Sequence, residues 1–148
     1  MKVKYFDLEN KRVFIMGGGS GIGASIVEHF CEQGSEVYFI DINEDESKKL
    51  IEDIKNKNYS LPTFIKCDLL NIKELQKTIA DIISEKGPID ILINNAANDT
   101  RHKIDDVTEE YWDERMNVNL RHFFFTVQSV KKSMIDNGGG AIINMGST

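Results

Sequence analysis

The chain has 148 residues, enough for one domain with a hydrophobic core, and a formal net charge of -6. An acidic chain lacks the basic surface that nucleic-acid binding requires. No apolar run is long enough to cross a bilayer, and the first residues lack the apolar core of a secretory signal, which predicts a cytoplasmic protein with no membrane partner. Cys31 and Cys67 are interpreted as small buried hydrophobic residues, and no spacing of His, Cys, Asp or Glu indicates a metal site.

The most informative stretch is a short apolar strand that runs directly into a cluster of glycines. Residues 13–16 (V-F-I-M) have the length and β-branched content of a buried strand. Five glycines follow within residues 17–23, and apolar residues at helical spacing then continue to Phe30, with Gly34 as the end of the helix. Such a turn lets a phosphate approach bare backbone at a helix N-terminus. Glycines alone are equally compatible with an ordinary tight turn.

The next strand favours dinucleotide binding over that alternative. Glu36 to Ile40 ends in Asp41, roughly 20 residues after the glycines, where a dinucleotide-binding βαβ unit places the acid that bonds the ribose hydroxyls. Strand, glycine turn, amphipathic helix, strand and acid therefore occur in the required order.

The rest of the chain continues the alternation of strands and helices. A polar lead-in comes first, whose Phe6 and Leu8 are expected to pack at the sheet edge. The later expected elements are a helix capped by Asn43, a strand at 63–67, a helix from Asn71 to Gly87, a strand at 89–93, a polar loop at 94–106, a long helix from Thr108 to about Asp136, and a strand at 141–145. This pattern predicts one α/β domain over residues 1–148, an open parallel sheet with helices on both faces.

Four motifs in this order resemble the short-chain dehydrogenase/reductase family over the whole chain. Met16 to Gly23 follows T-G-x-x-x-G-x-G with Met16 in place of Thr, and Asn94 to Ala97 follows N-N-A-G with Ala97 in place of Gly. The other two are Asn119 in N-V-N-L and Ser147 in N-M-G-S. The resemblance implies a Rossmann-type doubly wound sheet in the strand order 3-2-1-4-5, without the C-terminal strands of the family.

The resemblance also implies roles for individual residues. Asn119 would organise a proton-relay water, Ser147 would hold the substrate oxygen, and Asp68 would lie near the adenine. The implied cofactor-binding residues are Gly17, Gly19, Ser20, Gly21, Ile22, Gly23, Asp41, Ile42, Asp68, Leu69, Asn95, Ala96 and Ala97. Asp41 would repel a 2′-phosphate, and Ser20 and Ile42 stand where phosphate-preferring relatives carry a basic residue, which predicts NAD as the cofactor.

The substrate expected from the resemblance is a sugar. The runs at 94–102, 107–113 and 119–125 are similar to a subgroup of sugar 1-dehydrogenases, which oxidise an aldose at C1 to a lactone. Asn98 and His102 in the polar loop are the candidate substrate contacts, because a buried sugar hydroxyl needs a paired donor or acceptor. The alternative is a solvated loop beside the cofactor.

The family's catalytic tyrosine and lysine, in Y-x-x-x-K shortly after the serine, have no counterpart in this sequence, which ends one residue after Ser147. We therefore expect a fragment of an NAD-dependent sugar oxidoreductase, with little activity by itself and a homo-oligomer in the full-length form. The alternatives are a short dinucleotide-binding module without catalysis and the remnant of an interrupted reading frame. Tyr111 and Arg115 form Y-x-x-x-R early in the long helix and are interpreted as an ordinary helix-face pair.

Overall fold

A computed structural model describes residues 3–146 of the chain. Its centre is a sheet of five parallel strands in the spatial order β3-β2-β1-β4-β5, which confirms the predicted order. The strands are β1 (Arg12–Met16), β2 (Glu36–Asp41), β3 (Thr63–Lys66), β4 (Ile91–Asn94) and β5 (Ala141–Asn144). In the middle of the sheet, Phe14 pairs with Tyr38 on one side and Leu92 on the other. Because all five strands are parallel, their carboxyl ends share one edge of the sheet.

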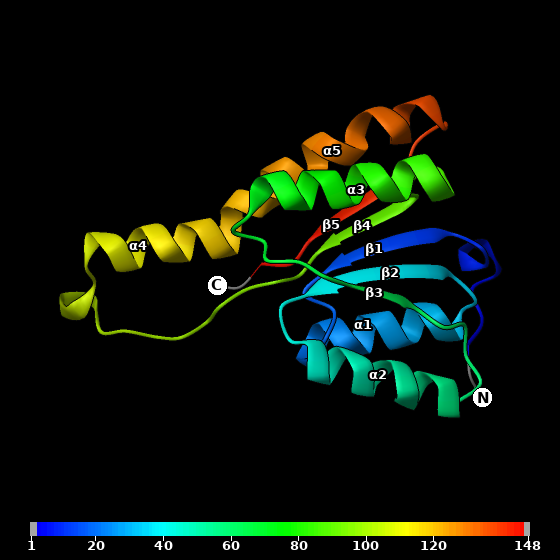
Figure 1. The fold of residues 1–148 in the computed structure, drawn as a ribbon, viewed down its shortest axis with the longest axis horizontal. Coiled ribbons are helices and arrows are strands. Elements are labelled where there is room, and N and C mark those ends of the chain that lie inside the picture. Colours follow the sequence, from blue (N-terminus) through cyan, green and yellow to red (C-terminus); the bar gives the residue numbers. More distant parts are fainter. Residues whose placement is uncertain (1–2, 147–148) are drawn as a thin grey trace.

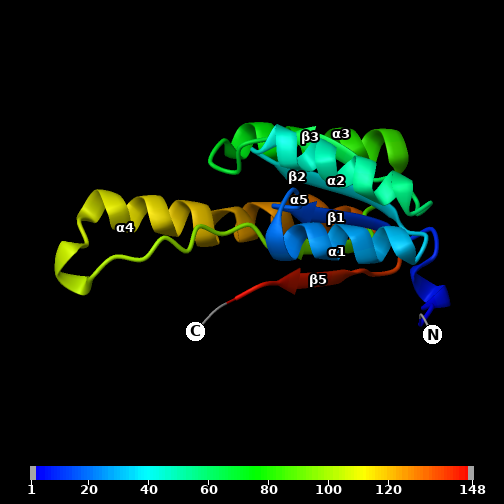
Figure 2. The same ribbon diagram turned by 90° about the horizontal axis from the view of Figure 1, so that it is seen from below.

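Helices cover both faces of the sheet, as predicted (Figure 1). The helices α1 (Gly21–Glu32) and α2 (Glu44–Asn56) lie against one face, and α3 (Ile72–Lys86) and α5 (His122–Asp136) lie against the other. Figure 2 shows β5 and β3 at opposite sides of the sheet. Within residues 3–146, no helix has the length and apolarity that a membrane crossing requires.

Strand β1 is buried on both faces because its side chains alternate between two cores. Phe14 and Met16 belong to the core beneath α3 and α5, and Val13 and Ile15 belong to the core beneath α1 and α2. All four side chains are fully buried. This explains why the strand is a continuous apolar run rather than an alternating one.

The two cysteines are buried free thiols, as predicted from their positions in the elements. Burial raises the pKa of Cys31 to about 12, with a smaller contribution from the charge of Glu28. Burial likewise raises the pKa of Cys67 to about 11. Both side chains therefore remain protonated near neutral pH and act as packing groups.

Side-chain caps begin three of the helices at the residues that the sequence predicts. Asn43, Asn71 and Thr108 accept hydrogen bonds from the backbone N–H groups of Glu46, Glu74 and Tyr111, respectively. Each bond satisfies one of the N–H groups that a helix start leaves without an intrahelical partner.

Replacing Asn43 with alanine is expected to lower the free energy of unfolding by about 1 kcal/mol, because the Glu46 N–H loses its acceptor. Urea unfolding measures this as a lower midpoint with an unchanged slope. Lys49→Ala, an exposed change within α2, is the control and should stay within about 0.5 kcal/mol. Equal midpoints for Asn43→Ala and the unmodified chain would show that the cap contributes nothing.

The long helix predicted from Thr108 to Asp136 is continuous but contains a π-helical segment. It consists of α4 (Glu109–Met116), the π-helical segment Asn117–Arg121, and α5. Together with the preceding loop, α4 extends beyond the end of the sheet (Figure 1). We call residues 98–116 the arm. A π-helical turn shifts the phase of the helix that follows, so α4 and α5 present different faces.

Two local expectations were wrong. Phe6 is 77% exposed, whereas Leu8, expected at the sheet edge with it, is half-buried. Polar bonds hold this segment, such as that from the Tyr5 N–H to the Gln33 side chain. Strand β4 begins at Ile91 rather than at residue 89, since the Asp90 carboxylate accepts from the Arg12 N–H at 2.8 Å.

Candidate functional site

The glycine turn between β1 and α1 brings bare backbone to the carboxyl edge of the sheet. Gly17 has φ +71°, and a Cβ there would lie 2.7 Å from Ala96. A Cβ on Gly23 would lie 1.8 Å from the Gly17 carbonyl oxygen, so the turn closes tightly on the start of α1. These positions accept only glycine, and they leave a cradle of N–H groups at a helix N-terminus that suits a pyrophosphate.

Asp41, at the end of β2, lies over this turn. Its Oδ2 accepts from the Gly19 N–H at 2.8 Å and its Oδ1 accepts from the Asn43 N–H at 2.9 Å. A Cβ on Gly19 would lie 2.9 Å from the same carboxylate. The carboxylate is thus fixed beside the turn, and Ile42, next to it, is 67% exposed. This fits a ribose bound at the edge of a dinucleotide cradle.

Asp68 and Leu69 follow β3 at the same edge of the sheet. The Asp68 Oδ1 accepts from the Leu70 N–H at 2.9 Å, which holds the turn before α3, while the Asp68 side chain stays accessible to solvent. Leu69 packs against the core beneath α3 and α5. The sheet therefore places both of these predicted cofactor-binding residues at the edge that carries Asp41.

The residues after β4 support the glycine turn from the other side. The Asn95 Nδ2 donates to the Gly17 carbonyl at 2.9 Å, and Ala96 packs against Gly17. Ala97 is exposed and lies outside the left-handed region, so alanine fits where the family motif has glycine. Asn94 itself is fully buried and bonds Thr126 and Asn144, at 2.8 Å each.

Asn119, in the π-helical segment, forms hydrogen bonds with the backbone of the arm at Asn98. Its Oδ1 accepts from the Asn98 N–H at 2.7 Å and its Nδ2 donates to the Asn98 carbonyl at 3.1 Å. The side chain is committed to these two bonds, so in this structure it acts on the loop that follows the cofactor-side residues. Ser147, the other predicted catalytic residue, lies outside the described residues.

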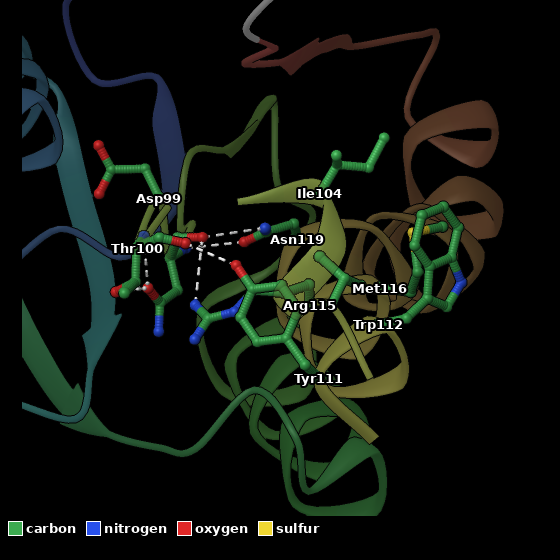
Figure 3. Close-up of a pocket in the computed structure, with 10 residues that line it drawn as sticks. Asp99, Thr100, Ile104, Tyr111, Trp112, Arg115, Met116 and Asn119 are labelled. Atoms are coloured by element: carbon green, nitrogen blue, oxygen red, sulfur yellow. Dashed lines mark hydrogen bonds between the residues drawn. The ribbon is translucent and has the colours of Figure 1, made fainter. Parts of the chain in front are cut away.

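A cavity of about 510 Å³ lies between the loop and the helix of the arm (Figure 3). Its polar lining includes Asn98, Thr100 and Asn119, and its apolar lining includes Trp112 and Met116. The volume is within the range of small-molecule sites. Asn98, one of the two predicted substrate contacts, therefore lines this cavity.

The two predicted substrate contacts make protein contacts of their own. The Asn98 Oδ1 accepts from both the N–H and the hydroxyl of Thr100, at 3.1 and 2.8 Å. The His102 ring packs on the Tyr111 ring with centroids 4.0 Å apart. Both residues thus help to shape the loop.

Among the described residues, no cluster of His, Cys, Asp and Glu side chains could hold a metal ion.

Tyr111 and Arg115 contribute to this region in a way that the sequence interpretation did not include. The Arg115 guanidinium lies 4.8 Å from the centroid of the Tyr111 ring, which is the expected helix-face contact. Both side chains also reach across to the loop backbone, at the carbonyl groups of Asn98 and Thr100. The i, i+4 spacing showed that the two side chains meet, but no sequence signal showed that the loop returns to them.

The five-stranded parallel sheet in the order 3-2-1-4-5, with helices on both faces, is a Rossmann-type fold, and comparison with known proteins identifies its family. The profile of the short chain dehydrogenase family matches residues 11–148, and the chain belongs to this family. Members of the family use nicotinamide cofactors.

Similar proteins include several sugar dehydrogenases. The chain is 48% identical over 143 residues to a D-xylose 1-dehydrogenase of Caulobacter vibrioides, covering 97% of this chain and 56% of that protein. It is 43% identical over 141 residues to a Rhizobium meliloti protein named "Probable galactose dehydrogenase", covering 95% and 55%. The structure of the Thermoplasma acidophilum aldohexose dehydrogenase superposes with a TM-score of 0.82 at 27% identity, covering 97% and 51%. The chain spans about half the length of the curated relatives it matches.

Proposed function

We propose that the protein is an NAD-dependent oxidoreductase that transfers a hydride between C1 of an aldose and NAD. The observation that carries the cofactor assignment is the Asp41 carboxylate, fixed by the Gly19 and Asn43 N–H groups beside a turn without side chains. A carboxylate accepts hydrogen bonds from both ribose hydroxyls and repels a 2′-phosphate, which supports NAD over its phosphorylated form.

The site residues bind different parts of NAD and of the substrate. The N–H groups at the start of α1, from Gly21 to Gly23, bind the pyrophosphate, Asp41 binds the ribose, and Asp68 borders the adenine. NAD, when bound, supplies the hydride acceptor. Asn119 holds the loop in place, and Ser147 binds the substrate oxygen. The sugar assignment is supported by the names of the relatives and by the polar wall of the cavity in the arm.

A second candidate is a dinucleotide-binding module without catalysis. Among the described contacts, the hydroxyl groups of Tyr38, Tyr59 and Tyr111 bond Glu36, Glu32 and the Thr100 carbonyl. Within residues 3–146 these three hydroxyl groups are therefore engaged by protein groups, and positioned proton transfer is commonly worth about 10²–10⁴-fold in rate.

The proposal includes a cytoplasmic location and a homo-oligomer in the full-length form. Leu120 and Phe124, four residues apart where the helical run enters α5, are 52% and 65% exposed. Such a pair of exposed apolar side chains favours association.

The test is the formation of NADH from NAD by the full-length protein, with D-xylose, D-galactose and glycerol as alternative substrates. The proposal predicts NADH formation with an aldose in preference to glycerol, and stoichiometric lactone. NADH formation with glycerol but with neither aldose would contradict the sugar assignment. NAD binding without turnover of any substrate would favour the non-catalytic module.

A further inference from the structure

The backbone of the arm's loop is held by three side chains from a single helical run (Figure 3). The Tyr111 hydroxyl donates to the Thr100 carbonyl at 2.7 Å, and the Arg115 Nη1 donates to the Asn98 carbonyl at 3.4 Å. Asn119 bonds both backbone groups of Asn98. The loop's position at the cavity is therefore set by contacts from α4 and the π-helical segment rather than by the sheet.

Arg115 is committed to these protein contacts rather than to solvent. Its side chain is 17% exposed, its guanidinium stacks over the Tyr111 ring, and its Nε is buried without a hydrogen-bond partner among the described residues. A guanidinium suits this place because its plane stacks on a ring while its fork donates sideways. A lysine would keep the charge but lose both geometric features.

We propose that Tyr111 and Arg115 are positioning residues that set the sugar specificity of the cavity by fixing the backbone of residues 98–100. This inference rests on the proposed aldose substrate. Asn98 and Thr100 form the polar side of the cavity, and Trp112 and Met116 form its apolar side. This combination suits a sugar ring, which carries hydroxyl groups on its rim and C–H groups on its face. Neither Tyr111 nor Arg115 needs to touch the substrate in this role.

Fixing the loop affects specificity because hydrogen bonds depend steeply on geometry. A bond weakens strongly once the donor and acceptor separate or misalign, so a displaced wall fails to distinguish the hydroxyl pattern of one aldose from that of another. A general loss of stability would weaken all sugars alike. A positioning role instead changes the ratio of two sugar affinities.

The experiment uses Trp112, the only tryptophan of the chain, as a fluorescent reporter in the wall of the cavity. The chain, saturated with NAD, is titrated with D-xylose and with D-galactose, and the ratio of the two Kd values is determined. Tyr111→Phe and Arg115→Lys are expected to change this ratio about fivefold, the effect of one net hydrogen bond. Hydrogen exchange at the amides of Asn98 and Thr100 should become faster in both variants.

Two matched variants serve as controls. Tyr59→Phe removes a hydroxyl that bonds Glu32 at 3.0 Å, and Arg121→Lys removes a guanidinium that lies 5.8 Å from the centroid of the Phe125 ring. Neither contact reaches residues 98–102, so the ratio of Kd values should remain within about twofold of the unmodified chain.

An unchanged ratio, or unchanged exchange at Asn98 and Thr100, would overturn the inference while leaving the proposed function intact. A chain that binds NAD but neither sugar would overturn the inference and the sugar assignment, and would leave the cofactor assignment standing. A chain that does not bind NAD would overturn the proposed function and the inference with it.

Discussion

Replacing Asp41 with arginine is expected to weaken NAD binding about 100-fold or more. The change removes a charged acceptor for two ribose hydroxyls, and each hydrogen bond to a charged group is worth about 1.5–3 kcal/mol. It also removes the carboxylate that bonds the Gly19 and Asn43 N–H groups. The guanidinium can pair with a 2′-phosphate, so the preference should move towards NADP. Titration calorimetry with both dinucleotides measures the effect.

Two further variants separate cofactor recognition from damage to the turn. Asp41→Asn keeps the size and one acceptor oxygen, so its NAD affinity should fall between those of the arginine variant and the unmodified chain. Asp53→Arg makes the same change of charge on the exposed face of α2 and should leave the Kd unchanged. Unaltered NAD affinity in Asp41→Arg would refute the ribose assignment.

Lowering the pH from 6.5 to 4 is expected to reduce the free energy of unfolding by about 3 kcal/mol through His122 alone. This side chain is fully buried, and burial lowers its pKa from 6.5 to about 4; the backbone of Val118 offsets only part of this shift. Above pH 6.5 the ring is neutral in both the folded and the unfolded chain, so His122 makes no pH-dependent contribution to the free energy of unfolding there. Between these values the unfolded chain binds a proton that the folded chain does not, so stability falls with the pH.

Most of this loss precedes the titration of the carboxylates. Glu44, whose pKa is lowered by hydrogen bonds from Lys48 and Lys66, loses its contribution only below its ordinary value of 4.5. Urea unfolding at a series of pH values from 7 to 4.5 therefore isolates His122. His122→Leu, or His122→Gln if the leucine variant does not fold, should flatten this dependence, whereas exposed His29→Gln should not. A His122 variant as acid-sensitive as the unmodified chain would contradict the prediction.

The regular part of the fold followed from local sequence signals. The apolar run of β1, the caps at Asn43, Asn71 and Thr108, and the helix end at Gly34 act through neighbouring residues, so their effects can be recognised in the sequence. Asp41 was found in the same way, because the length of a βαβ unit fixes where the second strand ends. The position of Asp41 beside the glycine turn could therefore be predicted from the sequence alone.

The arm could not be predicted in detail because its geometry depends on contacts between distant residues. The run N-V-N-L-R has no local feature that distinguishes a π-helical turn from an α-helical one, and Asn119 meets Asn98 only after the loop returns to the helix. Tyr111 and Arg115 were predicted as a helix-face pair, and their bonds to the loop depend on the same return. Asn98 was predicted from its polarity, which does not show that Thr100 already occupies its side-chain oxygen.

The most direct test of the central claim is titration calorimetry of the unmodified chain with NAD and NADP under identical conditions. The account predicts binding of one NAD per chain, more than about tenfold tighter than NADP, because the Asp41 carboxylate accepts from a ribose diol and repels a 2′-phosphate. Absence of NAD binding, or equal or tighter binding of NADP, would contradict it.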